Sequence, residues 1–270
     1  MRVLFAVAML VDVMATSAWA QNYTPPRSLP RTTSAPALRA LATRREVEER
    51  FRFGLAALAR SDWHDAIGEF ERIVALGAGE PQGSTARYDL ALAYANSGRN
   101  GEAAAQLRAA LALDPGFLAA MANLVSVDLA IGDLAEARRV ADRYVALAPD
   151  SARALYSRGI VALRAGDAAT AREDFGKLLH VNASYAVAHY DLALAEERLG
   201  RYEAAERELR SALALAPAYA RARFALGVVL LREGARSEAR NAFARATSDA
   251  DGDSALANIS AALRDSIHAP

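Results

Sequence analysis

Two sets of side chains recur along this sequence at a spacing that would let their members act together. Arg164, Arg198 and Arg232 stand 34 residues apart, and arginine forks bind carboxylates. A series of aromatic residues also recurs along the chain, with the same 34-residue step from Tyr156 to Phe224, and aromatic rings offer contact area to a peptide or a sugar. The series consists of Phe51, Tyr88, Tyr156, Tyr190 and Phe224. These residue types favour recognition of a partner over bond-making chemistry.

Residues suited to catalysis or metal binding are not grouped. Cysteine is absent, which excludes disulfides, thiolate nucleophiles and cysteine-ligated zinc. The segment from Asp249 to Asp253 resembles the opening of a calcium loop, but its glycine comes too early and Ser260 stands where the closing glutamate should be. The histidines have no metal-ligand spacing; they are His64, His180, His189 and His268. We therefore expect no enzyme activity, no catalytic residues, no metal and no cofactor.

The composition is typical of a helical protein and offers nothing to a polyanion. Ala, Leu and Arg are abundant, whereas the chain has only 16 Gly and 9 Pro. Acidic and basic residues balance at 32 each, so no net field attracts nucleic acid. Nucleic acid is not an expected partner.

The first 20 residues have the pattern of an export signal. Arg2 gives a positive start, residues 3–14 are apolar except for Asp12, and Ala18-Trp19-Ala20 forms a small-x-small cleavage site. A membrane anchor is the rival interpretation, but the apolar run is short for a bilayer and carries Asp12. We predict cleavage after Ala20, with Ala18 and Ala20 as the small residues of the site, a periplasmic location and a mature chain without a membrane span. Retention of the segment stays open.

Residues 21–43 are expected to form a disordered tether. Four prolines lie among Ser, Thr and Arg in this segment, a composition typical of extended chain. Thr43-Arg44-Arg45-Glu46 then has the pattern of a capping box that starts a helix. The ordered part is therefore expected to begin at residue 44.

The rest of the chain repeats itself with a period of 34 residues. Three registers show this period, and only the step between the first two repeats is slightly longer. Small residues mark a first helix: Gly54, Ala91, Val125, Gly159, Ala193 and Gly227. Glycines mark a turn: Gly98, Gly132, Gly166, Gly200 and Gly234. Alanines mark a second helix: Ala66, Ala103, Ala137, Ala171, Ala205 and Ala239.

This pattern resembles the tetratricopeptide-repeat family, whose unit is a helix–turn–helix. Leu90-Ala91-x-x-Tyr94 and Leu226-Gly227 match the family's first helix, and Ala171-x-x-x-Phe175 matches its second. The sequence departs from the family in lacking the first-helix Trp and in having Asp128 where Tyr is usual. The resemblance implies an all-α fold, a right-handed α-solenoid of six helix–turn–helix repeats with a C-terminal capping helix.

The repeats are expected to fill residues 44–251, and positions within each are counted from its first residue. Repeats 1 to 6 are residues 47–80, 84–117, 118–151, 152–185, 186–219 and 220–251. Residues 252–270 should form the capping helix, capped by Ser254, and a tail.

The resemblance also implies where a partner binds. In the family one face of the first helices lines a concave groove, and here that face is apolar at positions 5, 9 and 12 except for Ser126 and Glu197. The expected groove residues are Phe51, Tyr88, Leu92, Tyr156, Ile160, Leu163, Tyr190, Leu194, Phe224, Val228 and Leu231. The alternative, that these side chains only pack on one another, stays open.

A basic rim is expected beside the C-terminal half of that groove. It consists of Arg153, Arg164, Arg198, Arg221 and Arg232. These arginines could bind carboxylates of a partner. Equally, an arginine in the last turn of a helix could complement the helix dipole.

These features together predict a periplasmic scaffold or adaptor that binds a protein or peptide partner. By analogy with exported members of the family, it would serve envelope assembly or secretion. The alternative is a glycan-binding protein that uses the aromatic residues in polysaccharide export. The identity of the partner and the oligomeric state stay open.

Overall fold

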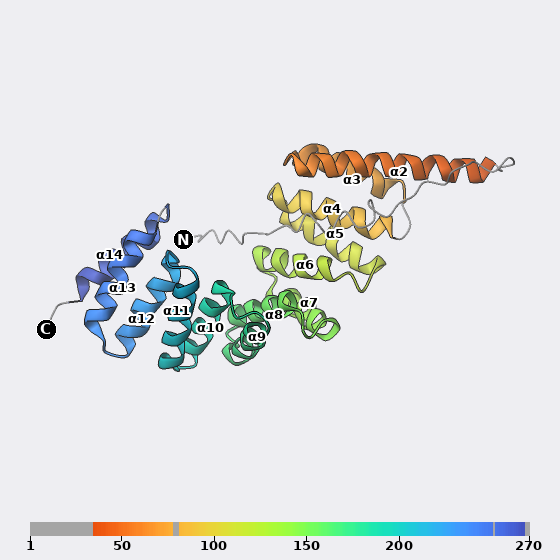
Figure 1. Cartoon of the computed structure of the whole chain (residues 1–270). Coiled ribbons are helices and arrows are strands. Elements are labelled where there is room, and N and C mark those ends of the chain that lie inside the picture. Colours follow the sequence, from red (N-terminus) through yellow and green to blue (C-terminus); the bar gives the residue numbers. More distant parts are fainter. Residues whose placement is uncertain (1–34, 78–80, 251, 268–270) are drawn as a thin grey trace. The chain divides into compact units, whose positions relative to one another are not determined.

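The computed structural model describes residues 35–77, 81–250 and 252–267, which form helices and turns without a strand (Figure 1). The expected signal peptide, with Ala18 and Ala20, and residues 21–34 lie outside the described residues. The helices are α2 (Ala35–Ala59), α3 (Trp63–Ala75), α4 (Gln82–Asn96), α5 (Asn100–Leu113), α6 (Leu118–Ile131), α7 (Leu134–Leu147), α8 (Ala152–Ala165), α9 (Ala168–Val181), α10 (Ala186–Arg198), α11 (Tyr202–Leu215), α12 (Ala220–Arg232), α13 (Arg236–Asp249) and α14 (Ser254–Ser266).

Helix α2 begins earlier than the sequence pattern predicted. Residues 35–43, expected to end the tether, are helical, and Thr43 lies inside the helix instead of capping it. Ala and Leu, both strong helix formers, make up most of residues 35–42. Pro36 falls in the first turn, where a helix tolerates proline. The structure therefore differs from the boundary expected at residue 44.

Each expected repeat contains one pair of helices joined by a short turn. The two helices of a pair pack together, as α4 does with α5, and the second helix of a pair also packs on the next first helix, as α5 does on α6. Helix α14 packs on α13 and closes the last pair. Its N-cap is Asp253, which accepts a hydrogen bond from the Leu256 N–H at 3.0 Å, and not Ser254 as expected from the sequence. The all-α fold and the solenoid of helix pairs are thus confirmed, whereas the right-handed twist stays a prediction.

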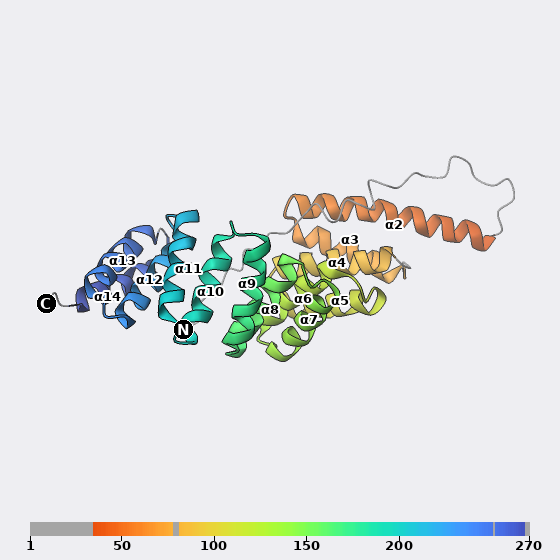
Figure 2. The same cartoon turned by 60° about the horizontal axis from the view of Figure 1, so that its bottom comes forward.

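The chain forms two compact parts, residues up to Val140 and residues from Ala141 onward, and α7 contributes to both. In the N-terminal part α2 contacts α4. In the C-terminal part α8 contacts α10 and α10 contacts α12, so these first helices lie side by side (Figure 2). Equivalent positions on neighbouring first helices therefore share one face, which we call the first-helix face.

The turn inside each repeat has one residue in the left-handed conformation, and this residue is glycine in every repeat but the first. Gly132 and Gly166 have φ of 86° and 81°, in the left-handed region where a Cβ atom is unfavourable. After each of them the chain turns back, and the Asp167 N–H donates to the Ala162 carbonyl at 2.9 Å. This bond satisfies a carbonyl that the helix end leaves unpaired. In repeat 1 the non-glycine Ser61 takes the same conformation, with φ of 59°.

Glycine at position 8 lets the two helices of a pair approach closely. A Cβ atom on Gly159 would lie 2.6 Å from the Phe175 ring, which is fully buried at position 24. Gly54 with Phe70 and Gly227 with Phe243 repeat this arrangement, each with a Cβ distance of 2.7 Å. Packed carbon atoms stay about 3.5–4.0 Å apart. The ring therefore occupies the space that a side chain at position 8 would need.

Where position 8 is larger, position 24 is smaller. Ala91 and Ala193 are matched by Leu107 and Leu209 at position 24, and all four are buried. Close-packed interiors tolerate changes best when the total volume is kept. The two positions thus act as one packing unit whose members change size together.

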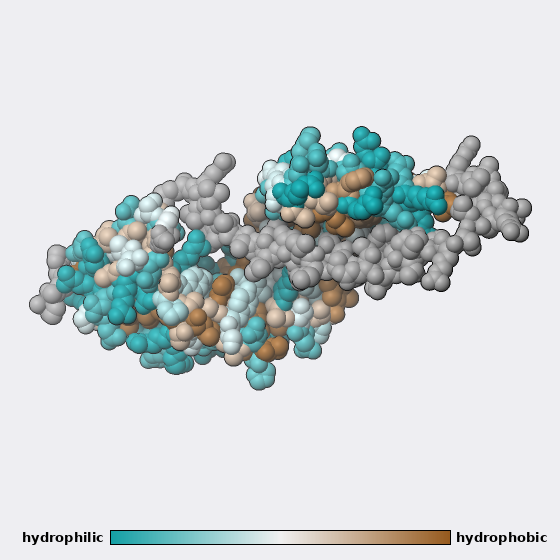
Figure 3. Space-filling view, turned by 45° about the horizontal axis from the view of Figure 1, so that its top comes forward, coloured by the Kyte–Doolittle hydropathy of each residue, from teal (hydrophilic) through white to brown (hydrophobic). Residues whose placement is uncertain are grey.

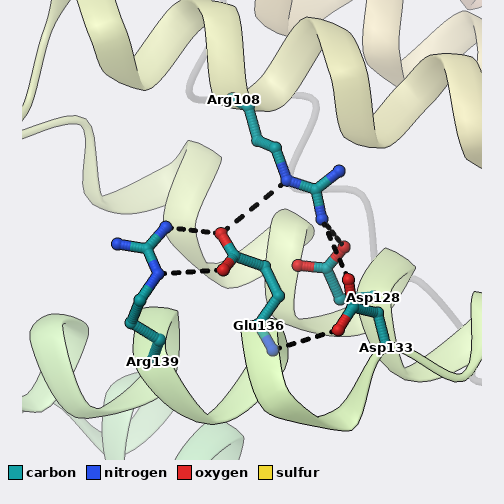
Figure 4. A network of polar contacts seen from close by, with 5 residues as sticks. All are labelled: Arg108, Asp128, Asp133, Glu136 and Arg139. Carbon is teal, nitrogen blue, oxygen red and sulfur yellow. Dashed lines mark hydrogen bonds and ion pairs between the residues drawn. The ribbon is translucent and has the colours of Figure 1, made fainter.

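A network of charges joins repeats 2 and 3 within the N-terminal part (Figure 4). Arg108 of α5 lies 2.6 Å from the Asp128 carboxylate near the end of α6, and 3.7 Å from both Asp133 and Glu136. Asp128 is fully buried. Burial raises the pKa of Asp128 to about 6, and the charge of Arg108 opposes the rise. Arg108 is therefore the cation that compensates a buried carboxylate.

The preceding junction uses the same two positions with different chemistry. The Tyr94 hydroxyl, at position 11, donates to Glu71, at position 25 of the previous repeat, over 2.5 Å. Asp128 and Arg108 occupy these positions one repeat later. The departure from the family's usual Tyr at Asp128 is thus accompanied by a matching change of its partner.

We predict that Arg108→Ala lowers the free energy of unfolding by about 3 kcal/mol, because Asp128 then stays buried without a cation. The double variant Arg108→Ala/Asp128→Asn, which removes the buried charge together with its cation, should recover most of the loss. Urea denaturation followed by circular dichroism measures both. Unchanged stability of Arg108→Ala would show that Arg108 does not compensate Asp128.

Candidate partner-binding face

In the N-terminal part the expected groove residues are buried. Phe51, Tyr88 and Leu92 are 4–5% exposed. The Tyr88 ring packs on Phe117 at 4.9 Å between centroids, and its hydroxyl accepts a hydrogen bond from the Asn123 amide at 3.1 Å. These contacts favour a packing role for the aromatic residues of this part.

In the C-terminal part most of the expected groove residues are partly exposed. Leu163 is buried, at 6% exposure. The half-buried residues, from α8, α10 and α12, are Tyr156, Ile160, Tyr190, Leu194, Phe224, Val228 and Leu231. On the described surface in Figure 3, small apolar patches interrupt a mostly hydrophilic exterior. Because α8, α10 and α12 are neighbours, these seven residues form one apolar surface on the first-helix face.

The aromatic residues at position 5 are supported from behind by the buried phenylalanines. The Tyr156 ring lies 5.9 Å from Phe175, and Phe224 lies 5.5 Å from Phe243. Each of these phenylalanines fills the space left by Gly159 or Gly227. The position-5 rings are therefore held by the packing within their own pair.

A second set of rings, which the sequence analysis missed, flanks the first. Tyr156 packs on Tyr185 at 5.6 Å and Tyr190 on Tyr219 at 5.2 Å. Tyr185 and Tyr219 are the last residues of their repeats and precede α10 and α12. The signal that could have found them is the recurrence of an aromatic residue at the final position of three repeats, which Phe117 begins.

Two buried carboxyl groups at position 6 were also missed. Asp89 is fully buried, and neither of its oxygens has a hydrogen-bond partner among the described residues. Burial raises its pKa to about 8. Asp191, at the same position in repeat 5, is 7% exposed and accepts a hydrogen bond from the Tyr156 hydroxyl. Burial raises the pKa of Asp191 to about 7, against the effect of that bond.

The contrast between Asp89 and Asp191 follows from the residue at position 5 of the preceding repeat. That residue is Tyr156 for Asp191, Tyr88 for Asn123 and Phe51 for Asp89. A phenyl ring has no hydroxyl to offer. The carboxyl of Asp89 therefore lacks the bond that its counterparts make.

The residues of the expected basic rim are all exposed. Arg164, Arg198 and Arg232 lie in the last turns of α8, α10 and α12. Arg198 donates to the Leu163 carbonyl in the last turn of α8. This bond supports the helix-end role for Arg198. Arg221 lowers the pKa of Tyr190 and Tyr219, although burial dominates and raises both.

Two further features of the described residues concern metal binding and membrane insertion. No group of three or more His, Asp or Glu side chains there could hold a metal ion. His189 instead contacts Glu208 at 2.6 Å and the Ala183 carbonyl at 3.1 Å. No helix in the same ranges combines the length and apolar character needed to cross a membrane.

We predict that Asp89→Asn raises stability at pH 8 by an amount on the order of several kcal/mol. The pKa of Asp89 is raised on folding, to about 8. Below about pH 4 the carboxyl is protonated in both the folded and the unfolded state and costs nothing. As pH rises from about 4 toward 8 the unfolded state ionises first, so the free energy of unfolding falls. The advantage of Asn should therefore vanish near pH 4.

The matched control is Asp174→Asn, the same change at a buried carboxylate that Arg158 binds through two hydrogen bonds of 2.8 and 2.6 Å. That variant should lose stability at pH 8. Urea midpoints at pH 4 and 8 measure both effects. A gain in stability for Asp89→Asn that did not depend on pH would show that the pKa of Asp89 is not raised on folding.

Comparison with family models finds tetratricopeptide-repeat matches along most of the described chain. The matched residues are 51–116, 97–158, 152–173 and 198–263. A comparison with curated proteins finds no match.

Solved structures share the fold. A MamA protein is 23% identical, with a TM-score of 0.57 over 62% of this chain and 92% of its own. A tetratricopeptide repeat protein from Parabacteroides merdae is 17% identical, with a TM-score of 0.66 over 83% of this chain and 94% of its own. A chain of the Cut9–Hcn1 hetero-tetramer of the APC/C is 20% identical, with a TM-score of 0.62 over 78% of this chain and 41% of its own.

Proposed function

The chain belongs to the tetratricopeptide-repeat family, and from that premise we propose that it is an exported scaffold whose first-helix face binds a peptide segment of a protein partner. One observation carries the proposal: apolar and aromatic side chains of α8, α10 and α12 stay partly exposed on neighbouring first helices. Contiguous exposed apolar surface is typical of interaction sites. A chain of similar fold occurs in the Cut9–Hcn1 hetero-tetramer, where the structure contains another protein.

The rings on this face suit a binding role because they are fixed before a partner arrives. Tyr156 is held between Phe175 and Tyr185, and Tyr190 packs on Tyr219. Ordering flexible side chains on binding costs about 0.5–1.5 kcal/mol for each of them. Side chains that packing already orders avoid much of this cost.

The proposed site lies in the C-terminal part. The equivalent N-terminal residues Phe51, Tyr88 and Leu92 are buried and offer little surface. The basic rim borders the C-terminal residues only. We assign Arg198 to the end of α8, since it binds the Leu163 carbonyl, and propose that the other rim arginines meet acidic residues of the partner.

The proposed location is the periplasm, and the proposed task is envelope assembly or secretion. The sequence pattern of residues 1–20, which is typical of an export signal, supports the location. Mass spectrometry of the protein from its native host should find Gln21 at the N-terminus. A full-length cytoplasmic product would overturn the proposed location.

Peptide binding can be tested with a displayed library of random 12-residue peptides selected on the full chain. Ile160→Asp/Leu194→Asp places charge in the middle of the apolar surface. It should weaken the selected peptides at least about tenfold, because central apolar contacts dominate such interfaces. The control Val181→Asp/Leu215→Asp makes the same change at exposed apolar residues of the second helices, and it should leave affinity unchanged.

Two results would contradict peptide binding on this face. Selected peptides whose affinity is unaffected by the Ile160/Leu194 variant would place the site elsewhere. A library that yields no peptide, together with sugar binding on a glycan array that the same variant abolishes, would favour the glycan-binding alternative, since aromatic rings also stack on sugars.

A further inference from the structure

Four tyrosines surround the buried carboxyl of Asp191 in the C-terminal part. Tyr156 donates a hydrogen bond to it, and the rings pack in two tilted pairs, with centroids 5.6 and 5.2 Å apart. The four tyrosines are Tyr156, Tyr185, Tyr190 and Tyr219, and all are half buried. They come from α8, from α10 and from the turns that precede α10 and α12. We call these five residues the tyrosine–aspartate cluster.

The cluster combines a buried carboxyl group with the faces of aromatic rings. Burial first, and the negative charge of Asp191 second, raise the pKa of all four tyrosines. The Oδ2 atom of Asp191 is buried and has no hydrogen-bond partner among the described residues. The faces of aromatic rings are themselves negative and attract cations. The carboxyl group of Asp191 and the faces of the four rings thus both favour a positive charge at this partly exposed surface.

The carboxylate is not needed to stack one repeat on the next. At the equivalent junction of repeats 2 and 3, Asn123 makes the same position-6 contact to the position-5 Tyr88 with a neutral amide. An aspartate in that place adds the cost of burying a charge, which an amide avoids. A buried polar group with an unsatisfied atom calls for an explanation, and packing does not supply one for Asp191.

We propose that the tyrosine–aspartate cluster binds one cationic side chain, lysine or arginine, of the partner segment. The inference rests on the proposed peptide-binding function and adds that the face selects partner segments with one positively charged side chain. The alkyl stem of the cation would lie along the tyrosine rings, with its charge directed at the Asp191 carboxylate.

The surroundings restrict the partner segment further. Arg221 lies close enough to lower the pKa of Tyr190 and Tyr219 against the effect of burial, and Arg153 is also exposed at position 2 of its repeat. A wholly basic segment would be repelled by these arginines. The segment that fits carries a single Lys or Arg flanked by acidic residues.

The displayed 12-residue peptide library, selected on the full chain, provides the test. Peptides selected by the wild type should share one Lys or Arg with acidic neighbours. Replacing that residue by the uncharged norleucine or Met should weaken binding roughly tenfold. Selection on Asp191→Asn should give peptides without the cation preference, and the wild-type peptide and its uncharged version should then bind this variant equally.

Asp89→Asn is the matched control, because it makes the same change at the same position of repeat 2. It should leave the cation preference intact. Circular dichroism of Asp191→Asn, which keeps an acceptor for the Tyr156 hydroxyl, should match that of the wild type.

The outcomes distinguish the cation site from the peptide-binding function on which it rests. Peptides that need Ile160 and Leu194 but show no cation preference, or that lose it equally in Asp89→Asn, would overturn the cation site and leave the proposed function standing. Failure to select any peptide that depends on Ile160 and Leu194 would overturn both.

Discussion

The approach of the two helices within a pair is the constraint on which the rest of the structure depends. Gly159 leaves room for the Phe175 ring, Phe175 supports Tyr156, and Tyr156 in turn holds Tyr185 and the Asp191 carboxyl. Every step in this chain is a contact between neighbouring elements. The half-exposed rings that form the proposed site are therefore a product of core packing one layer beneath them.

The same positions can be filled in more than one way as long as the pairing is kept. Position 8 with position 24 is Gly with Phe in three repeats and Ala with Leu in two others. Position 25 with position 11 is Glu71 with Tyr94 at one junction and Arg108 with Asp128 at the next. A repeat protein is stabilised by such nearest-neighbour contacts, so each repeat can vary provided that its partner varies with it.

The periodic residues made the helix pairs predictable from sequence, because Gly132 and its counterparts report a left-handed turn and Gly159 a close contact. The start of α2 was not predictable in this way, since prolines suggested a tether while Ala and Leu after residue 35 favoured a helix. The face of the first helices could be assigned, but its division into a buried N-terminal and a half-exposed C-terminal part could not. That division arises from tertiary contacts, such as the bond between Asn123 and Tyr88. The carboxyl of Asp191 could not be singled out from the sequence, because the tyrosines near it come from α8, from α10 and from the turns that precede α10 and α12, and are brought together only by folding.

The central claim is that positions 8 and 24 form one packing unit that sets the spacing of the helices. A double-mutant cycle of Gly159→Ala and Phe175→Leu, measured by urea denaturation, tests it most directly. Each single change should destabilise, the first by a clash and the second by a void. The double variant, which copies the buried pair Ala193 and Leu209 of repeat 5, should be more stable than the sum of the two changes by at least about 1 kcal/mol. Effects that add to within about 0.5 kcal/mol would show that the two positions are independent and would contradict the account.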